Sequence, residues 1–167
     1  MVITRHATAD ESDQVTRIAH DAYQHYTERI GKPAAPMTAD YAATIKAGNC
    51  WVAATDDEVL GFAVLIDQPD HLLLDNIAVS PAAQGHGVGA ALLHLAETEA
   101  QRRALTEIRL YTNEAMTENI TYYPRHGYSE THRGEQDGYR RVYFTKHLAS
   151  GTEASASTEA RSGHRSN

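Results

Sequence analysis

The sequence predicts an α/β domain with a mixed, mostly antiparallel sheet of six to seven strands flanked by about four helices. Short apolar runs joined by tight turns are typical of antiparallel strands, and helical periodicity dominates the N-terminal region. A strand–helix–strand unit over residues 71–112 adds one parallel pair to the sheet. With 167 residues, of which 41% are hydrophobic and 22% charged, the chain is long enough for one domain with a buried core.

The N-terminal region is expected to begin with a short strand at residues 2–3 and to continue as a helix. Thr8 and Glu11 have the spacing of a capping box at a helix start. Apolar side chains then recur at helical spacing, so that one face packs on the sheet. These side chains are Val15, Ile18, Ala19, Ala22, Tyr23, Tyr26 and Ile30. Gly31 is expected to end the helix, because glycine readily adopts the left-handed conformation found there.

A second, shorter helix follows a proline-containing connector at residues 32–36. We expect Thr38 to cap this helix and Gly48 to stop it, with Tyr41, Ala42 and Ile45 turned inward. The two helices and the connector would together form a lid over whatever the sheet binds.

Three apolar strands are predicted next, at residues 50–54, 59–67 and 71–79. The turns between them are short, which makes the three strands an antiparallel meander. A helix rich in Ala and Leu follows, and residues 107–112 alternate like a strand, which completes the parallel crossover.

The C-terminal region is predicted to hold a short helix and two strands. The helix starts near Thr117. Pro124 disfavours helical geometry at Tyr123, and Gly127 is expected to break what remains of the helix. Strands are expected near 128–133 and at 139–147. Residues 149–167 have no apolar periodicity and are predicted to be a disordered tail, which leaves residues 1–148 as the domain.

The stretch from Val79 to Ala90, with the sequence VSPAAQGHGVGA, organises the rest of the chain. Three glycines alternate with His86 and Val88 where the Ala- and Leu-rich helix begins. Glycine has no Cβ to keep a ligand from the backbone, and the first N–H groups of a helix are unpaired and carry the positive end of its dipole. Such a turn suits a phosphate group. A plain tight turn before a packed helix is the alternative.

Two phosphate-binding patterns compete for this stretch. Gly85, Gly87 and Ala90 satisfy a loose dinucleotide fingerprint, which needs its first glycine directly after the strand. The loop between the strand and the glycines is too long for that pattern, and Arg109 stands where the pattern has an acidic residue. The dinucleotide reading is therefore disfavoured.

The second pattern fits in register. Val79-x-Pro81-x-x-Gln84-Gly85-x-Gly87-x-Gly89 resembles the acetyl-CoA signature Gln/Arg-x-x-Gly-x-Gly/Ala of the GNAT superfamily of N-acetyltransferases. The resemblance implies a splayed GNAT-type sheet, acetyl-CoA as co-substrate, and a bulge that frees backbone groups of the fourth strand for the pantetheine arm. The residues that it implies for cofactor binding are Ile77, Ala78, Val79, Gln84, Gly85, His86, Gly87, Val88, Gly89 and Ala90.

A tyrosine segment supports the same resemblance. Tyr123 lies four residues before Gly127, as in the GNAT motif Tyr-x-x-x-Gly-Phe/Tyr, whose tyrosine hydroxyl faces the thioester sulfur. The resemblance implies that Tyr123 is the general acid that protonates the thiolate, and a core tyrosine is the alternative. Met116 stands where many relatives have an asparagine, and the nearby Asn119 or Asn113 could bond the cofactor instead.

Asp75 is the first candidate for the general base that deprotonates the amine. It lies in an apolar strand, four residues before Val79 and so on the same face, where a carboxylate is costly unless it is hydrogen-bonded or functional. A structural acid is the alternative reading, and His126 is a second candidate base. The ten histidines have no metal-binding spacing, so no metal is expected.

Composition limits the partners. The formal net charge of −7 argues against nucleic acid and mildly favours a cationic partner. The single cysteine, Cys50, excludes an internal disulfide, is expected in the core, and fits a reducing cytoplasm. No apolar run is long enough to span a membrane. The sequence thus predicts a cytoplasmic protein and leaves a homodimer open.

The function that the motifs predict is transfer of an acetyl group from acetyl-CoA to a primary amine, by direct attack with Tyr123 as acid. The acceptor, a small molecule or a protein amine, is left open, and Tyr23, Tyr26 and residues 32–37 are expected to select it. One alternative is a coenzyme-A-binding regulatory module without turnover, which would not need Tyr123. A nucleotide-binding domain is the other.

Overall fold

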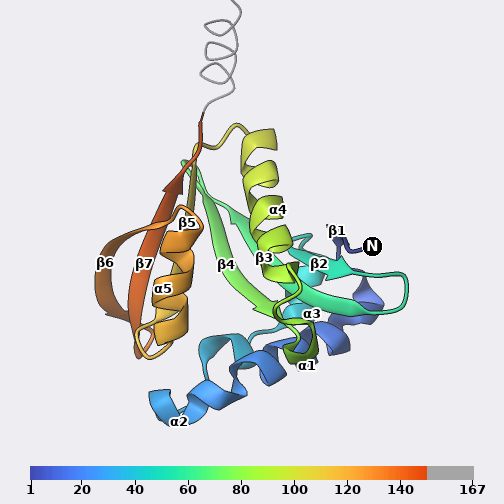
Figure 1. Cartoon of the computed structure of the whole chain (residues 1–167), viewed down its shortest axis with the longest axis horizontal. Coiled ribbons are helices and arrows are strands. Elements are labelled where there is room, and N and C mark those ends of the chain that lie inside the picture. The colour runs from blue at the N-terminus through green and yellow to red at the C-terminus, as the bar shows by residue number, and fades with distance from the viewer. Residues whose placement is uncertain (150–167) are drawn as a thin grey trace, which may run out of the picture.

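The computed structural model describes residues 1–149, in which seven strands form one sheet. The strands are β1 (Ile3–His6), β2 (Cys50–Ala54), β3 (Val59–Asp67), β4 (Leu72–Val79), β5 (Glu107–Asn113), β6 (Ser129–Gln136) and β7 (Tyr139–His147). Their order across the sheet is β1-β2-β3-β4-β5-β7-β6 (Figure 1). Only β4 and β5 are parallel neighbours, which confirms the mixed, mostly antiparallel sheet.

The helices are α1 (Ser12–Tyr23), α2 (Thr27–Ile30), α3 (Tyr41–Lys46), α4 (Val88–Arg102) and α5 (Thr117–Arg125). Single 3₁₀ turns join or precede them at Ala9–Glu11, Gln24–Tyr26, Ala35–Met37 and Pro81–Ala83. The expected capping box is present, since the Thr8 N–H donates to Glu11 Oε1 at 2.9 Å. Gly31 ends the first helical segment in the left-handed conformation, as expected.

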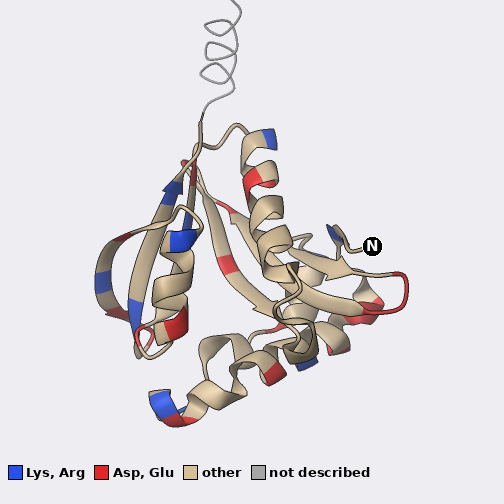
Figure 2. Ribbon diagram, viewed as in Figure 1, with Lys and Arg blue, Asp and Glu red and all other residues tan. Residues whose placement is uncertain are grey.

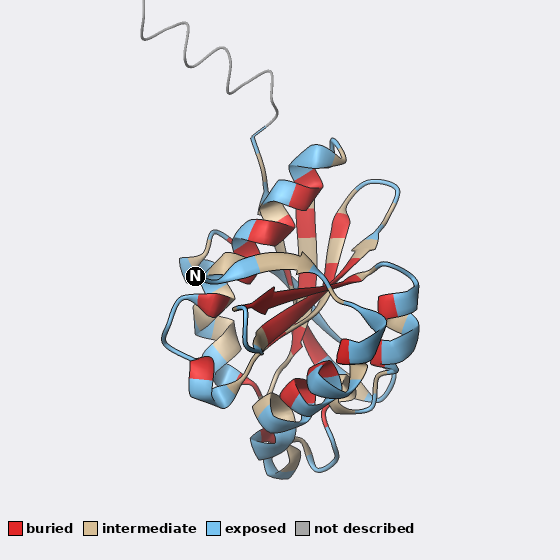
Figure 3. Cartoon of the chain, turned by 90° about the vertical axis from the view of Figure 1, so that its right-hand side faces the viewer, coloured by how far each residue is buried: buried red, intermediate tan, exposed pale blue. Residues whose placement is uncertain are grey.

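Two hydrophobic clusters cover the two faces of the sheet. On one face, α4 and α5 pack against every second residue of the strands, with Leu92, Leu74 and Phe144 at the centre. On the other face, α1 and α3 pack over Val52 and Phe62. Figure 3 shows the buried residues concentrated on the strands and on the inward sides of the helices. The alternation of side chains along the strands therefore divides the core into two layers.

The predicted boundaries of two elements, β1 and α3, are wrong. The first strand covers Ile3–His6 and not residues 2–3, because its pairing with β2 sets its extent, and His6 stacks on Trp51 with ring centroids 3.6 Å apart. The cap of α3 is Asp40, whose carboxylate accepts from the Ala43 N–H at 3.1 Å, and not Thr38, which closes the preceding turn. Tyr41 and Ile45 of this helix are buried as expected, but Ala42 is exposed.

Pro124 lies inside α5, although a proline there was expected to disfavour helical geometry at Tyr123. Near a helix C-terminus a proline removes only one backbone hydrogen bond. The chain instead closes the helix after it: the Tyr128 N–H donates to Tyr123 O at 3.2 Å, and Gly127 has a φ of +89°. The helix therefore ends before Gly127, as expected.

Cys50 is 1% exposed, as expected of a core residue. None of the helices within residues 1–149 is long and apolar enough to cross a membrane. The predicted tail lies, apart from residue 149, outside the described residues.

Replacing Gly61 of β3 with Ala should destabilise the fold, because α4 crosses the sheet closely at this point. A Cβ on Gly61 would lie 2.8 Å from Ala78 O and 3.1 Å from Val88 Cγ1. We expect the free energy of unfolding in denaturant to fall by about 1–3 kcal/mol, the usual cost of overpacking. The control is Gly134→Ala in β6, whose Cβ would meet nothing within 4 Å. Equal losses in the two variants would contradict the close packing of α4.

Candidate functional site

The parallel strands β4 and β5 separate along their length. They pair only over residues 72–74 of β4 and 108–110 of β5. Beyond this point β4 continues to Val79 and β5 to Asn113 without pairing with each other. Figure 1 shows the two strands diverging toward α1 and α2. The sheet therefore contains a wedge between these strands, which we call the β4–β5 gap.

A β-bulge lies where the gap opens. The register between β3 and β4 leaves Asp75 as an extra residue between the paired Leu74 and Asn76. Because side chains alternate between the two faces of a strand, one extra residue exchanges the faces. Leu74 before the bulge and Ile77 after it both pack on the α4 side, whereas Ala78 packs on the α1 side.

The bulge also corrects the expected position of Asp75. Counting alternate residues along the strand predicted that Asp75 lies on the same face as Val79. That expectation is wrong, because the bulge interrupts the alternation: Val79 packs on the α4 side, and Asp75 follows Leu74 onto the α1 side.

The edge of β4 that borders the gap offers backbone groups of alternate residues. The Ser80 N–H donates to Leu60 O of β3 at 2.8 Å. Alternation then turns the backbone of Ala78 toward β3, and that of Ile77 and Val79 toward the gap. Of the three residues expected to offer free backbone groups, two are placed to do so.

Tyr23, the last residue of α1, reaches into the gap. Its hydroxyl donates to Ile77 O at 2.6 Å, between residues 54 positions apart in the sequence. Burial raises the pKa of Tyr23, so the phenol keeps its proton. This bond ties α1 to the gap and occupies one backbone acceptor that the sequence analysis reserved for a ligand.

The glycine loop, residues 84–90, leads from β4 into α4. Gly85 and Gly87 have φ of +81° and +82°, a conformation that side chains rarely adopt. The first hydrogen bond of α4 runs from the Ala91 N–H to Gly87 O at 3.0 Å. The N–H groups of residues 88–90 therefore lack partners within the helix and carry the positive end of its dipole. This geometry fits a phosphate group.

A cleft of about 640 Å³ runs from the glycine loop to the β4–β5 gap, and we call it the large cleft. The sequence-predicted cofactor residues that line it are Ile77, Ala78, Val79, Gln84, Gly85, Gly87, Val88, Gly89, Ala90 and Asn119. His86 is exposed and does not line the cleft. None of the described residues that line it is Lys or Arg, and Figure 2 shows neither on the loop before α4. Backbone N–H groups and the helix dipole are thus the positive groups that this part of the cleft offers to an anion.

Tyr123 projects from α5 toward the gap and is 6% exposed. Its ring packs against Tyr128 and Phe144, with ring centroids 5.7 Å apart in both pairs. Its hydroxyl has no hydrogen-bond partner among residues 1–149. Two other unpaired polar groups in this part of the chain, Trp51 Nε1 and the Tyr128 hydroxyl, are fully enclosed, but the Tyr123 hydroxyl is not. The hydroxyl therefore remains accessible from the cavity. Burial raises the pKa of Tyr123 well above its ordinary value.

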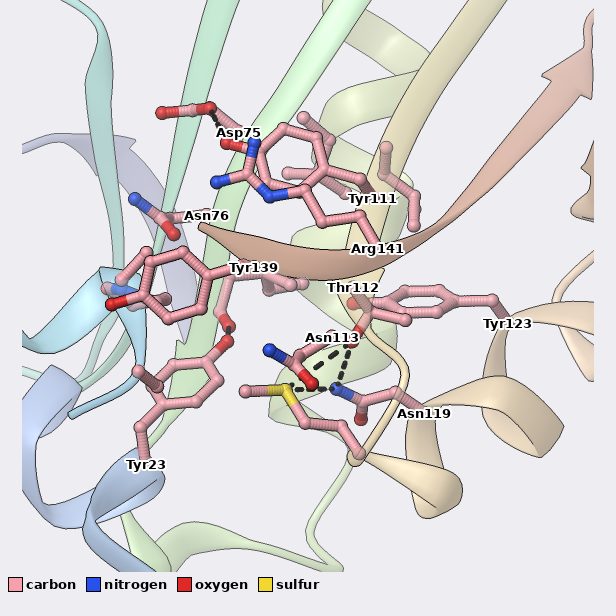
Figure 4. A pocket seen from close by; sticks show the side chains of 17 residues that line it. Tyr23, Asp75, Asn76, Tyr111, Thr112, Asn113, Asn119, Tyr123, Tyr139 and Arg141 are labelled. Carbon is pink, nitrogen blue, oxygen red and sulfur yellow. Dashed lines mark hydrogen bonds between the residues drawn. The ribbon is translucent and has the colours of Figure 1, made fainter. Parts of the chain in front are cut away.

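A smaller pocket opens on the face of the sheet where Asp75 lies, and we call it the small pocket (Figure 4). Its volume is about 50 Å³, which suits a few water-sized groups because one water needs roughly 10–15 Å³. The Tyr111 hydroxyl donates to Asp75 Oδ1 at 2.7 Å. Burial, together with this bond to Asp75, raises the pKa of Tyr111, so Tyr111 stays a donor.

The large cleft and the small pocket meet in the gap. Four residues line both: Tyr23, Ile77, Asn119 and Tyr123. A molecule in the large cleft and another in the small pocket would therefore approach each other beside the Tyr123 hydroxyl and the Ile77 backbone.

Asn119 and Asn113 hold different positions around this junction. Asn119 Nδ2 donates to Thr112 Oγ1 at 3.1 Å, and Met116, at 4% exposure, packs beside it. Asn113 Oδ1 accepts the Ala115 N–H at 2.9 Å and so caps the start of the turn into α5. Of the two asparagines, only Asn119 lines both cavities, and its Oδ1 has no partner among the described residues.

The lid residues divide between the two cavities. Residues 34–36 line the small pocket together with Tyr23. Tyr139 of β7 fixes this connector, because its hydroxyl donates to Pro33 O at 2.7 Å and Lys32 lies 4.0 Å above its ring. Tyr26 lines the large cleft only, and its hydroxyl donates to the Glu118 carboxylate at 3.3 Å.

His126, the second candidate base, lies on the large cleft and not on the small pocket. Its ring centroid is 4.3 Å from that of Tyr122. Asp75 therefore lies on the side where a second molecule could enter, and His126 does not. No cluster of His, Cys, Asp and Glu suited to a metal ion occurs within residues 1–149.

Sequence reasoning missed Tyr111 and Arg141, which line the small pocket with Asp75. Both alternate with buried residues of their strands: Tyr111 follows Leu110, and Arg141 precedes Val142. A charged residue beside an apolar run was the signal that selected Asp75. The same signal at Arg141 could have found it.

Comparison with known proteins identifies a matching family and fold. Residues 13–128 match the model of the acetyltransferase (GNAT) family. A comparison with curated proteins finds no match.

Solved structures share the fold at low sequence identity. PaiA N-acetyltransferase from Thermoplasma acidophilum, solved with coenzyme A, is 15% identical with a TM-score of 0.73, covering 89% of this chain and 99% of that chain. The ribosomal-protein-S18-alanine N-acetyltransferase from Escherichia coli is 19% identical with a TM-score of 0.69, covering 89% and 95%. Ard1 from Thermoplasma volcanium is 16% identical with a TM-score of 0.71, covering 89% and 98%.

Proposed function

The chain belongs to the acetyltransferase (GNAT) family, and from this premise we propose that it transfers the acetyl group of acetyl-CoA to a primary amine by direct attack. Acetyl transfer with acetyl-CoA as co-substrate is the activity of the family. The observation that carries the finer proposal is the junction of the two cavities at Ile77 and Tyr123. The large cleft would hold acetyl-CoA, and the small pocket would hold the amine.

The glycine loop would hold the pyrophosphate. The N–H groups of residues 88–90 are free of helical partners, and Gly87 leaves open space in front of the backbone. The backbone of Ile77 and Val79 borders the gap, where it could bond the pantetheine arm and the thioester carbonyl.

Tyr123 would act as the general acid. In the reaction a C–N bond forms to the amine and the C–S bond of the thioester breaks, so the departing thiolate needs a proton. The Tyr123 hydroxyl is unpaired within the described chain and reaches the junction. Burial raises the pKa of Tyr123, and the same desolvation would raise the basicity of a thiolate beside it, so the two groups remain matched.

Asp75 would act as the general base, directly or through a water. Its carboxylate lines the small pocket, and within residues 1–149 Tyr111 bonds only one of its oxygens. The attacking amine, which is mostly protonated at neutral pH, would lose its proton toward this carboxylate.

An acetyl-CoA turnover screen tests the proposal. The protein is incubated with acetyl-CoA and, separately, with amino acids, polyamines, aminoglycosides and peptides, and the free thiol is measured. Thiol release that depends on one amine class, with the acetylated amine found by mass spectrometry, supports the proposal. Release that no amine increases would contradict it.

Replacing Asp75 with Asn should lower kcat about 100-fold, the scale expected for one general base. The amide keeps an acceptor for the Tyr111 hydroxyl, so the pocket should retain its shape. Steady-state kinetics on the best acceptor measures the change, and the KM for acetyl-CoA should stay the same. Asp70→Asn is the control, because the Asp70 side chain is 72% exposed and lies outside both cavities. A kcat equal to that of the unmodified protein would remove Asp75 from the mechanism.

A further inference from the structure

The small pocket carries two opposite charges. Among the described residues that line it, Asp75 is the only anion and Arg141 the only cation. The two groups do not form an ion pair with each other, because no guanidinium nitrogen of Arg141 lies within ion-pair distance of the Asp75 carboxylate in the described chain. The remaining lining groups are neutral. A ligand with a positive and a negative group would therefore find an oppositely charged partner for each in this pocket.

Arg141 is buried and only partly satisfied. The residue is 7% exposed, and its Nη1 donates to Gln136 Oε1 at 3.0 Å. The nearest carboxylate, that of Asp137, is 3.8 Å away and 77% exposed, so water screens it. Nε and Nη2 have no hydrogen-bond partner among residues 1–149. A buried guanidinium with free N–H groups is costly unless a ligand pairs with it.

The guanidinium is held in one place by an aromatic ring. Its Cζ lies 4.1 Å from the centroid of Tyr111, whose hydroxyl in turn donates to Asp75. Figure 4 shows the guanidinium pointing from β7 toward Asp75 and Tyr111. Tyr111 thus spaces the cation and the anion of the pocket at fixed positions. A planar guanidinium whose Nε and Nη2 are both free can bind the two oxygens of a carboxylate with two parallel hydrogen bonds.

We propose that the acceptor is an amino acid, that is, a small primary amine that carries a carboxylate, and that Arg141 binds this carboxylate. The inference rests on the proposed acetyl transfer and names its substrate class. The amine would lie toward Asp75 and the junction at Tyr123, and the carboxylate toward Arg141. The product would be an N-acetyl amino acid, formed as the thioester C–S bond breaks and the thiolate takes a proton.

Other acceptors fit these contacts less well. A polyamine or an aminoglycoside would bring further positive charge against Arg141. The amino terminus of a protein has an amide where an amino acid has its carboxylate, which would leave the buried guanidinium unpaired. The small volume of the pocket, about 50 Å³, also favours a small acceptor group.

The first test compares each of the common amino acids with its carboxamide as acceptor for the unmodified protein. We expect kcat/KM to be on the order of 10- to 100-fold higher for the carboxylate, the range for hydrogen bonds to a charged group. The amine of a carboxamide is less basic, so more of it is unprotonated at neutral pH. This difference alone would favour the carboxamide, so a preference for the carboxylate must come from its recognition by the protein. Carboxamides, polyamines or peptides acetylated as well as the best amino acid would overturn the proposal.

The second test uses Arg141 variants with a matched control. Arg141→Gln should raise the KM for the amino acid on the order of 10- to 100-fold while the KM for its carboxamide and for acetyl-CoA stays the same. Arg141→Lys, which keeps the charge, should recover part of the loss. The control is Arg140→Gln, because the adjacent Arg140 is 77% exposed and pairs with Glu114. Equal losses on the amino acid and on the carboxamide would mean that Arg141 supports only the fold.

Direct binding separates this inference from the proposed acetyl transfer. If the protein acetylates no amine, the proposed transfer has failed, and calorimetry with N-acetyl amino acids and their amides still decides whether the pocket recognises a carboxylate. Tighter binding of the acids, lost in Arg141→Gln, would support the carboxylate site. Binding of neither, or of both equally, would overturn it.

Discussion

Replacing Tyr123 with Phe should lower kcat at least about 100-fold on a good acceptor, the scale expected when one general acid is removed. The change deletes only the hydroxyl and keeps the ring against Tyr128 and Phe144. Because that hydroxyl has no hydrogen-bond partner within the described residues, its removal should cost little stability and leave the affinity for acetyl-CoA nearly unchanged. Steady-state kinetics, with acetyl-CoA binding measured by calorimetry, checks both expectations.

Tyr128→Phe is the matched control for this experiment. Tyr128 belongs to the same aromatic cluster, and its hydroxyl is also unpaired, but it is fully enclosed and lines neither cavity. Its loss should leave kcat unchanged. Burial raises the pKa of Tyr123, so the acid keeps its proton through neutral pH and the deficit of Tyr123→Phe should persist across that range. Turnover by Tyr123→Phe at the unmodified rate would show that another group protonates the thiolate.

The parts of the fold that the sequence predicted well depend on local chemistry. The bounds of β2 and β3 agree with prediction because apolar runs and turns specify them. The start of α4 is fixed by the alternating glycines, and Gly87 adopts the conformation that only glycine accepts easily. Local preference failed at Pro124, where the packing of Tyr123 against its aromatic neighbours keeps the helix intact past the point at which proline disfavours it.

The geometry of the candidate site depends on contacts between distant segments, which no local pattern shows. The bulge at Asp75 is one added residue in an apolar run, and it becomes visible only through the register with β3. The bond from Tyr23 to Ile77 joins the first helix to the fourth strand. The arrangement of Asp75, Tyr111 and Arg141 needs three strands in their correct order. Local patterns therefore predicted the family and the glycine loop, but not the arrangement of Asp75, Tyr111 and Arg141.

Gly87→Val should abolish the binding of acetyl-CoA. Gly87 has a φ of +82°, and a Cβ added to it would meet no atom within 4 Å. We propose that the phosphate lies in this open space in front of the loop. A valine would both strain the loop and fill that space, so that the N–H groups of residues 88–90 could no longer reach a phosphate. At a concentration of 100 Kd the unmodified protein gains about 2.7 kcal/mol from its ligand, and we expect this thermal stabilisation to vanish in the variant.

Backbone strain alone would lower the free energy of unfolding without changing the affinity for acetyl-CoA. The variant Gly48→Val separates strain from the loss of ligand binding. Gly48 has a φ of +77°, a Cβ there would also meet nothing within 4 Å, and it lies outside both cavities. Both variants should therefore lose a similar free energy of unfolding, about 1–2 kcal/mol for a left-handed side chain, but only Gly87→Val should lose stabilisation by acetyl-CoA. NAD serves as the second ligand. If Gly87→Val still gains stability from acetyl-CoA, or if NAD stabilises the unmodified protein equally well, the loop does not hold the pyrophosphate of coenzyme A in the proposed way.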